Sequence, residues 1–339
     1  MFKFAAGCAR MDFLWFIQRP VDPMSEYSKI PAAIWAIGGG KGGTGKTFLS
    51  AGLAIALSAE RGDIVAVDAD LGGPNLHTLL GVRENGRDLG DFIRNEVGSL
   101  EDIAMPTSFP GLRLIRGSDN MLFLANLNHY RKLKLIRQIK GLPAKGVVID
   151  LGTGSAYNTL DLFMTASPGI LVVTPEPTAV ENAYLFLKSC ALRVLRAYAR
   201  YFGVQDFETK VSQGLEHAST TLMTFMENLT ASDASAAQVL TAALRSFKVY
   251  LVINKARDRK DGHLGRSIVD VVRKYFLIDM DLLGTIPYDE RVHWSLRSFS
   301  PFIIEYPDSA VSQSIRLMAE RLSLESQPVG PQEGRSPQV

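Results

Sequence analysis

Eight consecutive residues carry the clearest chemical signal in the sequence, and all of them are candidates for binding phosphate. They are Gly40, Lys41, Gly42, Gly43, Thr44, Gly45, Lys46 and Thr47. Glycines in such a loop let successive backbone N–H groups point at phosphate oxygens. In this spacing Lys46 reaches the β and γ phosphates, and the Thr47 hydroxyl ligates Mg²⁺. The segment therefore predicts a P-loop that binds ATP with Mg²⁺.

A dinucleotide site is the alternative interpretation of the same glycines. Gly38, Gly40 and Gly43 match the G-x-G-x-x-G fingerprint, and Asp68 ends the next apolar run, where an acid could bind a ribose. However, a dinucleotide fold has no need of Lys46 followed by Thr47, whereas a triphosphate with Mg²⁺ needs both. The P-loop is accordingly the favoured interpretation.

Three carboxylates follow apolar runs downstream of the loop. Asp150 ends the run 147–149, and Asp68 and Asp70 follow the run 64–67. An acid at the end of a buried strand is the usual holder of Mg²⁺ beside a P-loop, and we assign this role to Asp150. Hydrolysis also needs a group that orients the attacking water, and Asp70 is the candidate. Asp68 is expected to support either Mg²⁺ or the loop.

The elements that must position these residues alternate along the chain as short apolar runs and amphipathic helices. This pattern predicts an α/β fold, a mainly parallel twisted sheet with helices on both faces. The expected strands are 33–37, 64–68, 112–116, 147–150, 169–174, 249–254 and 281–284. The clearest expected helices are 48–60, 128–140, 179–200, 265–275 and 311–322.

We expect three parts in the chain: an N-terminal extension (1–31), a P-loop ATPase domain (32–322) and a disordered tail (323–339). Residues 203–246 are interpreted as a helical insertion, because two stretches have helical periodicity with no strand between them. The extension carries apolar residues interrupted by charges, so a weak interfacial anchor stays open, and Met24 is an alternative start.

Composition excludes several classes of protein. The net charge of +2 provides no long-range field that would require nucleic acid or a membrane, and no run reaches the length of a membrane span. Cys8 and Cys190 form no C-x-x-C pair, and the five histidines show no ligand spacing. We expect a cytoplasmic protein with no protein-ligated transition metal, which also argues against a metallocluster carrier.

Two helices are rich in basic residues. Arg193, Arg196 and Arg200 recur at helical spacing in one of them. The other carries Arg131, Lys132, Lys134, Arg137 and Lys140. Such residues can contact DNA phosphates or anionic headgroups, but charges on a helix more often face solvent without a partner. We favour the solvent-facing interpretation and expect Leu133, Ile136 and Ile139 to lie in the core.

The P-loop, with its extra lysine at position 41, resembles the deviant Walker A motif of the MinD/ParA ATPases. The resemblance continues through residues 67–76, 150–154 and 174–179 and covers most of 32–322. It implies that ATP drives formation of a face-to-face homodimer, in which Lys41 contacts phosphates bound by the partner subunit. Lys41 therefore joins Lys46 and Asp70 as an expected catalytic residue. The resemblance also implies adenine contacts from Asn254 and from the loop containing Pro287.

Segments 161–163, 175–178 and 283–289 look most similar to FlhG-like flagellar-number regulators. This branch implies a weak ATPase, stimulated by a protein partner, that controls flagellar number or placement or organises the cell pole or division site. A ParA-like partition ATPase that binds DNA nonspecifically is the alternative. The polar, proline-containing tail after residue 322 does not match the membrane-targeting helix of that branch. Membrane association therefore cannot be carried over from the resemblance, and peripheral attachment to the inner face of the membrane is left as an open alternative.

Overall fold

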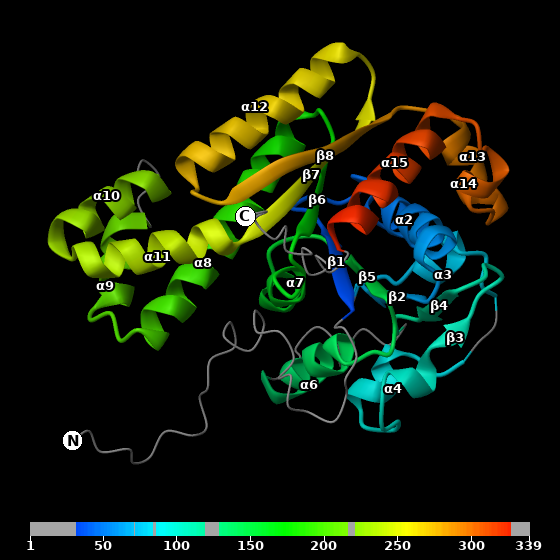
Figure 1. The fold of residues 1–339 in the computed structure, drawn as a ribbon, viewed down its shortest axis with the longest axis horizontal. Helices are drawn as coiled ribbons and strands as arrows, with labels where there is room; N and C mark the ends of the chain where they lie inside the picture. The colour runs from blue at the N-terminus through cyan, green and yellow to red at the C-terminus, as the bar shows by residue number, and fades with distance from the viewer. Residues whose placement is uncertain (1–31, 71, 84–85, 119–128, 216–220, 327–339) are drawn as a thin grey trace, which may run out of the picture.

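Eight strands form one sheet in the computed structural model, which describes residues 32–70, 72–83, 86–118, 129–215 and 221–326 (Figure 1). Most of these strands are runs of Val, Ile, Leu and Ala that are buried on both faces, as in a parallel sheet covered by helices. The strands are β1 (Ala33–Gly38), β2 (Ile64–Ala69), β3 (Met105–Pro106), β4 (Leu112–Ile115), β5 (Gly146–Leu151), β6 (Gly169–Val173), β7 (Lys248–Ala256) and β8 (Asp279–Pro287).

The order of strands across the sheet is β3-β4-β2-β5-β1-β6-β7-β8. Every neighbouring pair is parallel except β3 with β4, which is antiparallel. This confirms the predicted fold class and the seven predicted strands. The sequence did not indicate β3, because a two-residue strand is too short to show a period.

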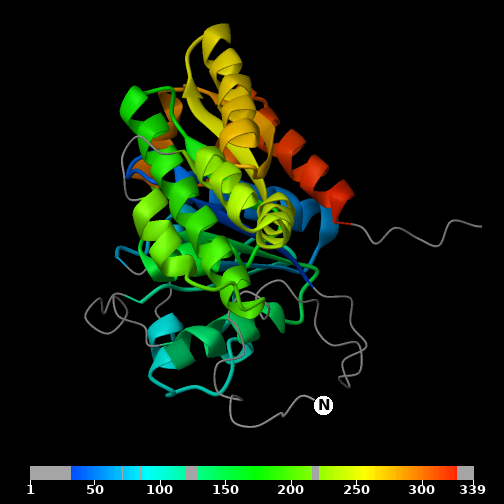
Figure 2. The same cartoon turned by 90° about the vertical axis from the view of Figure 1, so that its left-hand side faces the viewer.

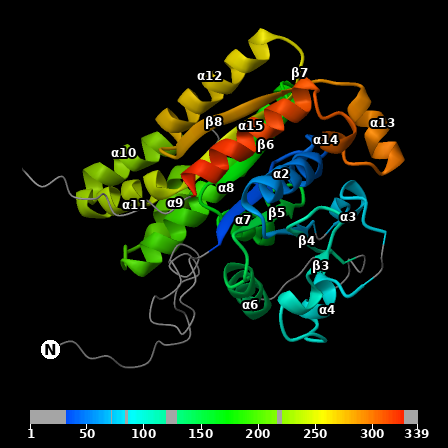
Figure 3. The same ribbon diagram turned by 45° about the vertical axis from the view of Figure 1, so that its right-hand side comes forward.

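Helices cover both faces of the sheet. One face packs against α2 (Lys46–Arg61), α3 (Leu76–Leu79), α14 (Phe302–Glu305) and α15 (Ala310–Glu325). Figure 3 shows α15 alongside α2. The opposite face packs against α4 (Leu89–Ile93), α6 (His129–Lys140), α7 (Tyr157–Phe163), α8 (Pro177–Tyr201) and α12 (Arg259–Tyr275). Outside the stretch 203–246, the remaining elements are η1 (Glu101–Ile103) and α13 (Arg291–Ser298).

Residues 203–246 contain the helices α9 (Phe207–Leu215), α10 (Leu222–Ser232) and α11 (Ala234–Ser246). The described part of this stretch is therefore mainly helical, and its interpretation as an insertion stays a prediction. These helices gather around the end of α8 on one side of the molecule (Figure 2). Phe207, Phe225 and Leu240 are buried there and extend the core outward from α8.

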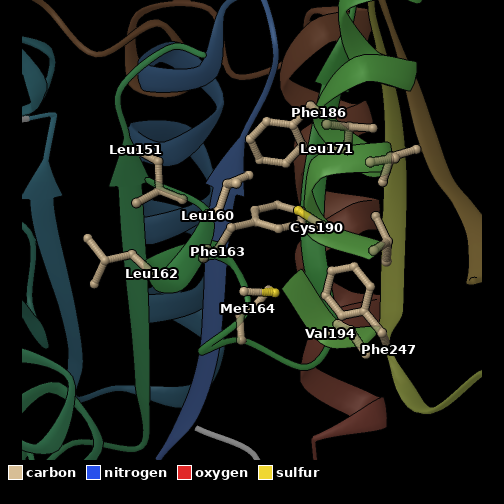
Figure 4. Close-up of a cluster of buried hydrophobic side chains, with 14 of the residues drawn as sticks. Leu151, Leu160, Leu162, Phe163, Met164, Leu171, Phe186, Cys190, Val194 and Phe247 are labelled. Atoms are coloured by element: carbon tan, nitrogen blue, oxygen red, sulfur yellow. The ribbon is translucent and has the colours of Figure 1, made fainter. Parts of the chain in front are cut away.

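An aromatic cluster ties α7 and α8 to the sheet (Figure 4). Phe163 of α7 packs edge-on against Phe186 of α8, with ring centroids 5.0 Å apart, and Phe247 closes the same cluster. Cys190 is a free thiol buried beside them, and burial raises its pKa well above the ordinary value. Cys8 lies outside the described residues. Packing of these aromatic side chains therefore fixes α7, which follows β5, and α8, which follows β6, against the sheet.

Several helix bounds differ from the prediction. α12 begins at Arg259 rather than 265, because Asp258 and Asp261 form a capping box that starts the helix earlier. α15 runs to Glu325, three residues past the expected end of the domain at 322. Residues 1–31 and 327–339 lie outside the described residues. No helix in the described part of the chain has both the length and the apolar character needed to cross a bilayer.

Candidate nucleotide site

The predicted P-loop lies at the carboxyl edge of the sheet, between the end of β1 and the start of α2. The neighbours of β1 in the sheet are β5 and β6, so the chain leaves β1 where the strand order reverses. In open α/β sheets this switch point is where ligands bind. Asp68 and Asp150 lie opposite each other on β2 and β5. The strand order thus brings the loop and the acids to one edge.

The loop is curled by two left-handed residues, Gly43 with φ 75° and Gly45 with φ 92°. A Cβ at Gly45 would lie 2.1 Å from the Nδ2 atom of Asn254, so any other residue would displace that side chain and strain the left-handed backbone. Asn254 Nδ2 donates to the carbonyl of Thr44 at 2.7 Å. Its Oδ1 accepts from the backbone N–H of Lys255 at 2.9 Å. Asn254 therefore holds the loop, and its expected adenine contact stays a prediction.

Lys46 is nearly buried, with 6% of its surface exposed. Its Nζ lies 3.4 Å from the carbonyl of Lys41 and bridges the loop. Burial lowers the pKa of the Lys46 amine, while the carboxylates of Asp150 and Asp70 raise it. A cation enclosed by glycines and facing two acids is suited to neutralising phosphate.

Asp150 is fully buried, and burial raises its pKa to about 7, whereas the nearby hydroxyls of Ser50 and Thr47 lower it. Ser50 Oγ donates to Oδ1 at 2.8 Å. Oδ2 is buried without a hydrogen-bond partner among the described residues. A buried carboxylate oxygen lacking a donor, beside a threonine hydroxyl, fits a hydrated Mg²⁺. Thr47 and Asp150 are the residues that would hold the ion.

Asp68 is also fully buried, and burial together with the adjacent Asp150 raises its pKa to about 8. Its two oxygens accept from backbone N–H groups, Oδ1 from Asp70 at 3.2 Å and Oδ2 from Leu76 at 2.9 Å. Asp68 thus anchors both ends of the loop that follows β2. Of the two roles expected for it, support of the loop is the one that these contacts favour.

Asp70 lines the cavity together with Thr153 from the loop after β5. Its Oδ1 accepts from Gly72 N at 3.0 Å, and a Cβ on Gly152 would lie 2.7 Å from the same oxygen. The loops after β2 and β5 therefore pack closely at this point. A carboxylate in this position faces the space next to Lys46.

Lys41 reaches the start of α8 within its own chain. Its Nζ donates to Thr178 Oγ1 at 2.7 Å and lies 3.4 Å from Glu176 Oε2. Hydrogen bonds from Thr174 and Lys41 hold the pKa of Glu176 below its ordinary value. About a third of the Lys41 side chain remains exposed, since its exposed fraction is 37%. The lysine is accessible and rests on a helix that begins 136 residues further along the chain.

A cavity of about 540 Å³ opens next to the loop, within the size range of ligand pockets. Six of the residues named from the sequence line it, namely Gly43, Gly45, Lys46, Thr47, Asp70 and Asn254. Ile286, Pro287 and Tyr288 line it from the end of β8, and Val292, His293 and Leu296 from α13. The structure therefore brings Pro287 to the cavity, at an apolar wall where a base could stack.

Several contributors to the site were not identified from the sequence. Ser50 lies one helical turn after Lys46, and this spacing could have suggested it. Lys255 donates through Nζ to the carbonyl of Gly43 at 2.8 Å, and Glu176 and Thr178 hold Lys41. The contacts of these residues cross more than a hundred positions of sequence, and α13 has no motif. Glu176 and Thr178 lie in the segment 174–179 that carries the family resemblance, but that resemblance did not indicate their contact with Lys41.

The basic helices differ from the expectation of purely solvent-facing charges. Asp161 of α7 is fully buried and pairs with Lys132 of α6 and Arg193 of α8. The Nη2 atom of Arg193 lies 2.6 Å from Oδ2 of Asp161. Two predicted surface charges are thus tied into the interior beneath the loop after β5. Leu133 is half-buried, while Ile136 and Ile139 are in the core as expected.

Comparison with known proteins agrees with this geometry. Residues 35–302 match the family model of the CobQ/CobB/MinD/ParA nucleotide-binding domain. The antiactivator FleN of Pseudomonas aeruginosa is 25% identical over 305 residues, covering 89% of this chain and 90% of FleN. The flagellum site-determining protein YlxH of Helicobacter pylori is 31% identical over 156 residues, covering 45% of this chain and 52% of YlxH.

Solved structures show the same fold at lower identity. The septum site-determining protein MinD of Pyrococcus horikoshii, solved with Mg-ADP, aligns with a TM-score of 0.60 at 20% identity. That alignment covers 88% of this chain and all of the MinD chain. The chain therefore belongs to the MinD/ParA family of P-loop ATPases, with FleN and YlxH as relatives at low identity.

Proposed function

We propose that this chain is a Mg-ATP-dependent switch that dimerises on binding ATP and is reset by hydrolysis. One observation carries the proposal: Lys46, Thr47 and Asp70 converge on one cavity at the switch point of the sheet, with Asp150 buried behind them. A second lysine, Lys41, lies at the mouth of the same loop with part of its side chain exposed. This combination suits a triphosphate whose phosphates are contacted by residues of two subunits.

In the hydrolytic step a water oxygen bonds to the γ-phosphorus, the bond from that phosphorus to the bridging oxygen breaks, and ADP leaves. Asp70 faces the space beside Lys46, so it is placed to orient the water and to accept its proton. Lys46 and the backbone N–H groups of the loop stabilise the charge on the phosphate oxygens. Bound Mg²⁺ would supply further charge neutralisation at Thr47 and Asp150.

Dimerisation assigns a second role to Lys41. In the single chain its ammonium is held by Glu176 and Thr178. On formation of a face-to-face dimer, we expect it to turn to the phosphates bound by the partner, as an arginine finger does in other NTPases. The nucleotide charge and the subunit contact would then be coupled.

The test of this function separates binding from dimerisation. Lys46→Ala is expected to abolish Mg-ATP binding, because it removes the buried cation. Lys41→Ala is expected to bind Mg-ATP as a monomer but to lose the ATP-dependent dimer. Equilibrium binding of a fluorescent ATP analogue and light scattering after gel filtration measure the two properties. Normal binding by Lys46→Ala would overturn the nucleotide site, and normal dimers of Lys41→Ala would overturn the role across the interface.

We further propose that the switch controls the number or placement of flagella through a protein partner that stimulates its weak ATPase activity. The support comes from the relatives FleN, an antiactivator, and YlxH, a flagellum site-determining protein. Flagella counted by electron microscopy in a strain lacking the gene, and in a Lys46→Ala strain, test this role. Unchanged number and position in both strains would contradict it.

A further inference from the structure

The end of β7 contains a bulge next to the P-loop. Ile253 pairs with Thr285 on β8, and Ala256 pairs with Pro287. Three residue steps along β7 are therefore matched by two along β8. The residues between the two pairs are Asn254 and Lys255. Lys255 adopts a left-handed backbone conformation with φ 60°. Residues other than Gly, Asn and Asp rarely adopt this conformation. Bulges near functional sites commonly redirect a side chain.

Here the bulge sends two consecutive side chains to two consecutive carbonyls of the P-loop. Lys255 Nζ donates to the carbonyl of Gly43 at 2.8 Å, and Asn254 Nδ2 donates to the carbonyl of Thr44 at 2.7 Å. Asn254 is buried, whereas Lys255 is exposed at the cavity wall. Together these two side chains hold the backbone of the loop at Gly43 and Thr44.

Fixing a carbonyl also fixes the next N–H group, because the peptide unit is planar and its C=O and N–H point in opposite directions. The bond from Lys255 to the carbonyl of Gly43 therefore orients the N–H of Thr44. The bond from Asn254 to the carbonyl of Thr44 likewise orients the N–H of Gly45. With their carbonyls bonded to Lys255 and Asn254, both N–H groups are turned away from these two side chains.

We propose that Lys255 is a positioning residue for phosphate binding, which holds the Gly43 carbonyl so that the loop keeps its N–H groups directed at the nucleotide phosphates. This inference rests on the proposed binding of Mg-ATP. It extends the site to a residue outside the P-loop and outside the acidic strand ends. It also gives a reason for a lysine, rather than a glycine, in the left-handed conformation.

The experiment uses the full chain and compares Lys255→Met, Lys255→Gly and Lys255→Arg with wild type. Lys255→Gly removes the side chain while suiting the left-handed backbone, so the fold is retained. Lys274→Met, at the exposed end of α12, is a matched control for the loss of an ammonium group. Binding of a fluorescent ATP analogue with Mg²⁺ and of adenosine is measured, with melting temperature recorded in the absence of nucleotide.

Lys255→Met and Lys255→Gly are expected to weaken Mg-ATP binding by roughly tenfold, the effect of one charge-assisted hydrogen bond. Lys255→Arg should recover most of the affinity, and Lys274→Met should match wild type. Adenosine has no phosphates, so its affinity should not change. A positioning effect should also persist at roughly 0.5 M salt, where attraction between exposed charges is screened.

Three outcomes would overturn the inference alone, with wild type binding Mg-ATP. The first is binding of Mg-ATP by Lys255→Met and Lys255→Gly within twofold of wild type. The second is an equal loss of adenosine affinity, and the third is a defect that disappears in high salt. Failure of wild type itself to bind Mg-ATP would instead overturn the proposed function, and the inference with it.

Discussion

At the residue scale, three carboxylates share one edge of the sheet but have different surroundings. Asp68 uses both oxygens to hold the backbone of the loop after β2. Asp150 is buried with one oxygen unpartnered among the described residues. Asp70 lines the cavity and is only lightly held, by the N–H of Gly72. Different environments separate the roles of like groups. We therefore expect Asp70, rather than Asp68 or Asp150, to act on water.

Replacement of Asp70 tests this division of roles. Asp70→Ala and Asp70→Asn are expected to bind Mg-ATP normally but to lower the rate of hydrolysis by roughly 100-fold or more, the range of general base catalysis. Both should therefore accumulate as ATP-bound dimers. Phosphate release and light scattering measure the two effects. The asparagine can still accept from Gly72, so wild-type hydrolysis by either variant would exclude Asp70 as the catalytic group.

At the element scale, the contact between the P-loop and α8 is set by close backbone approach. A Cβ at Gly40 would lie 2.1 Å from the carbonyl oxygen of Asn182, which is backbone and cannot move aside. We expect Gly40→Ala to lower the free energy of unfolding by about 1–3 kcal/mol, the usual range for overpacking. Urea denaturation without nucleotide measures this change in the free energy of unfolding.

Gly42→Ala is the matched control for Gly40→Ala, since its Cβ would meet only Thr153 Cγ2 at 3.7 Å, an ordinary van der Waals contact. Its stability should stay close to that of wild type. Equal stability of the two alanine variants would show that α8 does not constrain the loop at Gly40.

The buried ion cluster around Asp161 is the second contact that holds elements together. Asp161 joins α7, which follows the Asp150 loop, to Lys132 of α6 and Arg193 of α8. Asp161→Asn breaks the ion pairs that this buried carboxylate makes with Lys132 and Arg193, so we expect a loss of about 3–5 kcal/mol in the free energy of unfolding, the range for breaking a buried pair. Denaturant titration of the metal-free chain gives the value.

An exposed ion pair between α8 and α9 provides the comparison for the Asp161 cluster. Glu208→Gln removes the contact between Arg196 and Glu208, at 3.1 Å, where both side chains are more than a third exposed. Its expected cost is about 0–1 kcal/mol. If Asp161→Asn were as mild as Glu208→Gln, the buried cluster would not be what holds α7 and α8 together.

At the scale of the whole molecule, the nucleotide cavity joins elements from both ends of the described chain. The P-loop follows β1, while β8 and α13 provide the apolar wall. A ligand that contacts both should stabilise the chain as a unit. At a concentration of about 100 times Kd, binding adds about 2.7 kcal/mol. Thermal melting should therefore shift upward with Mg-ATP and much less with ATP plus EDTA. Equal shifts would contradict the Mg²⁺ site at Thr47 and Asp150.

DNA binding distinguishes the flagellar proposal from the partition alternative at the same scale. A partition ATPase should retain nonspecific DNA only with ATP, and the affinity should fall steeply as salt rises. We expect no ATP-dependent retention of a DNA duplex at low salt, measured by filter binding or anisotropy. Salt-sensitive retention that requires ATP would favour the partition role instead.

The sequence by itself determined the elements that carry a local signal. Residues 40–47 predicted the P-loop, and continuous apolar runs predicted the seven longer strands and the parallel sheet, which the structure and the family match confirm. Asp68 and Asp150 could be placed at one edge because parallel strands end on the same side. These inferences need only local spacing and burial pattern.

Only the tertiary structure decided which distant residues complete the site. Lys41 rests on Glu176 and Thr178, and Lys255 reaches Gly43, because the strand order places β6 next to β1 and β7 next to β6. The two basic helices looked solvent-facing until the fold placed Asp161 between them. Such contacts depend on the arrangement of strands and on close packing of side chains. Neither leaves a pattern in local sequence, so the phosphate loop could be predicted while the contacts that hold it could not; Asn254 was named from the sequence, but for an adenine contact.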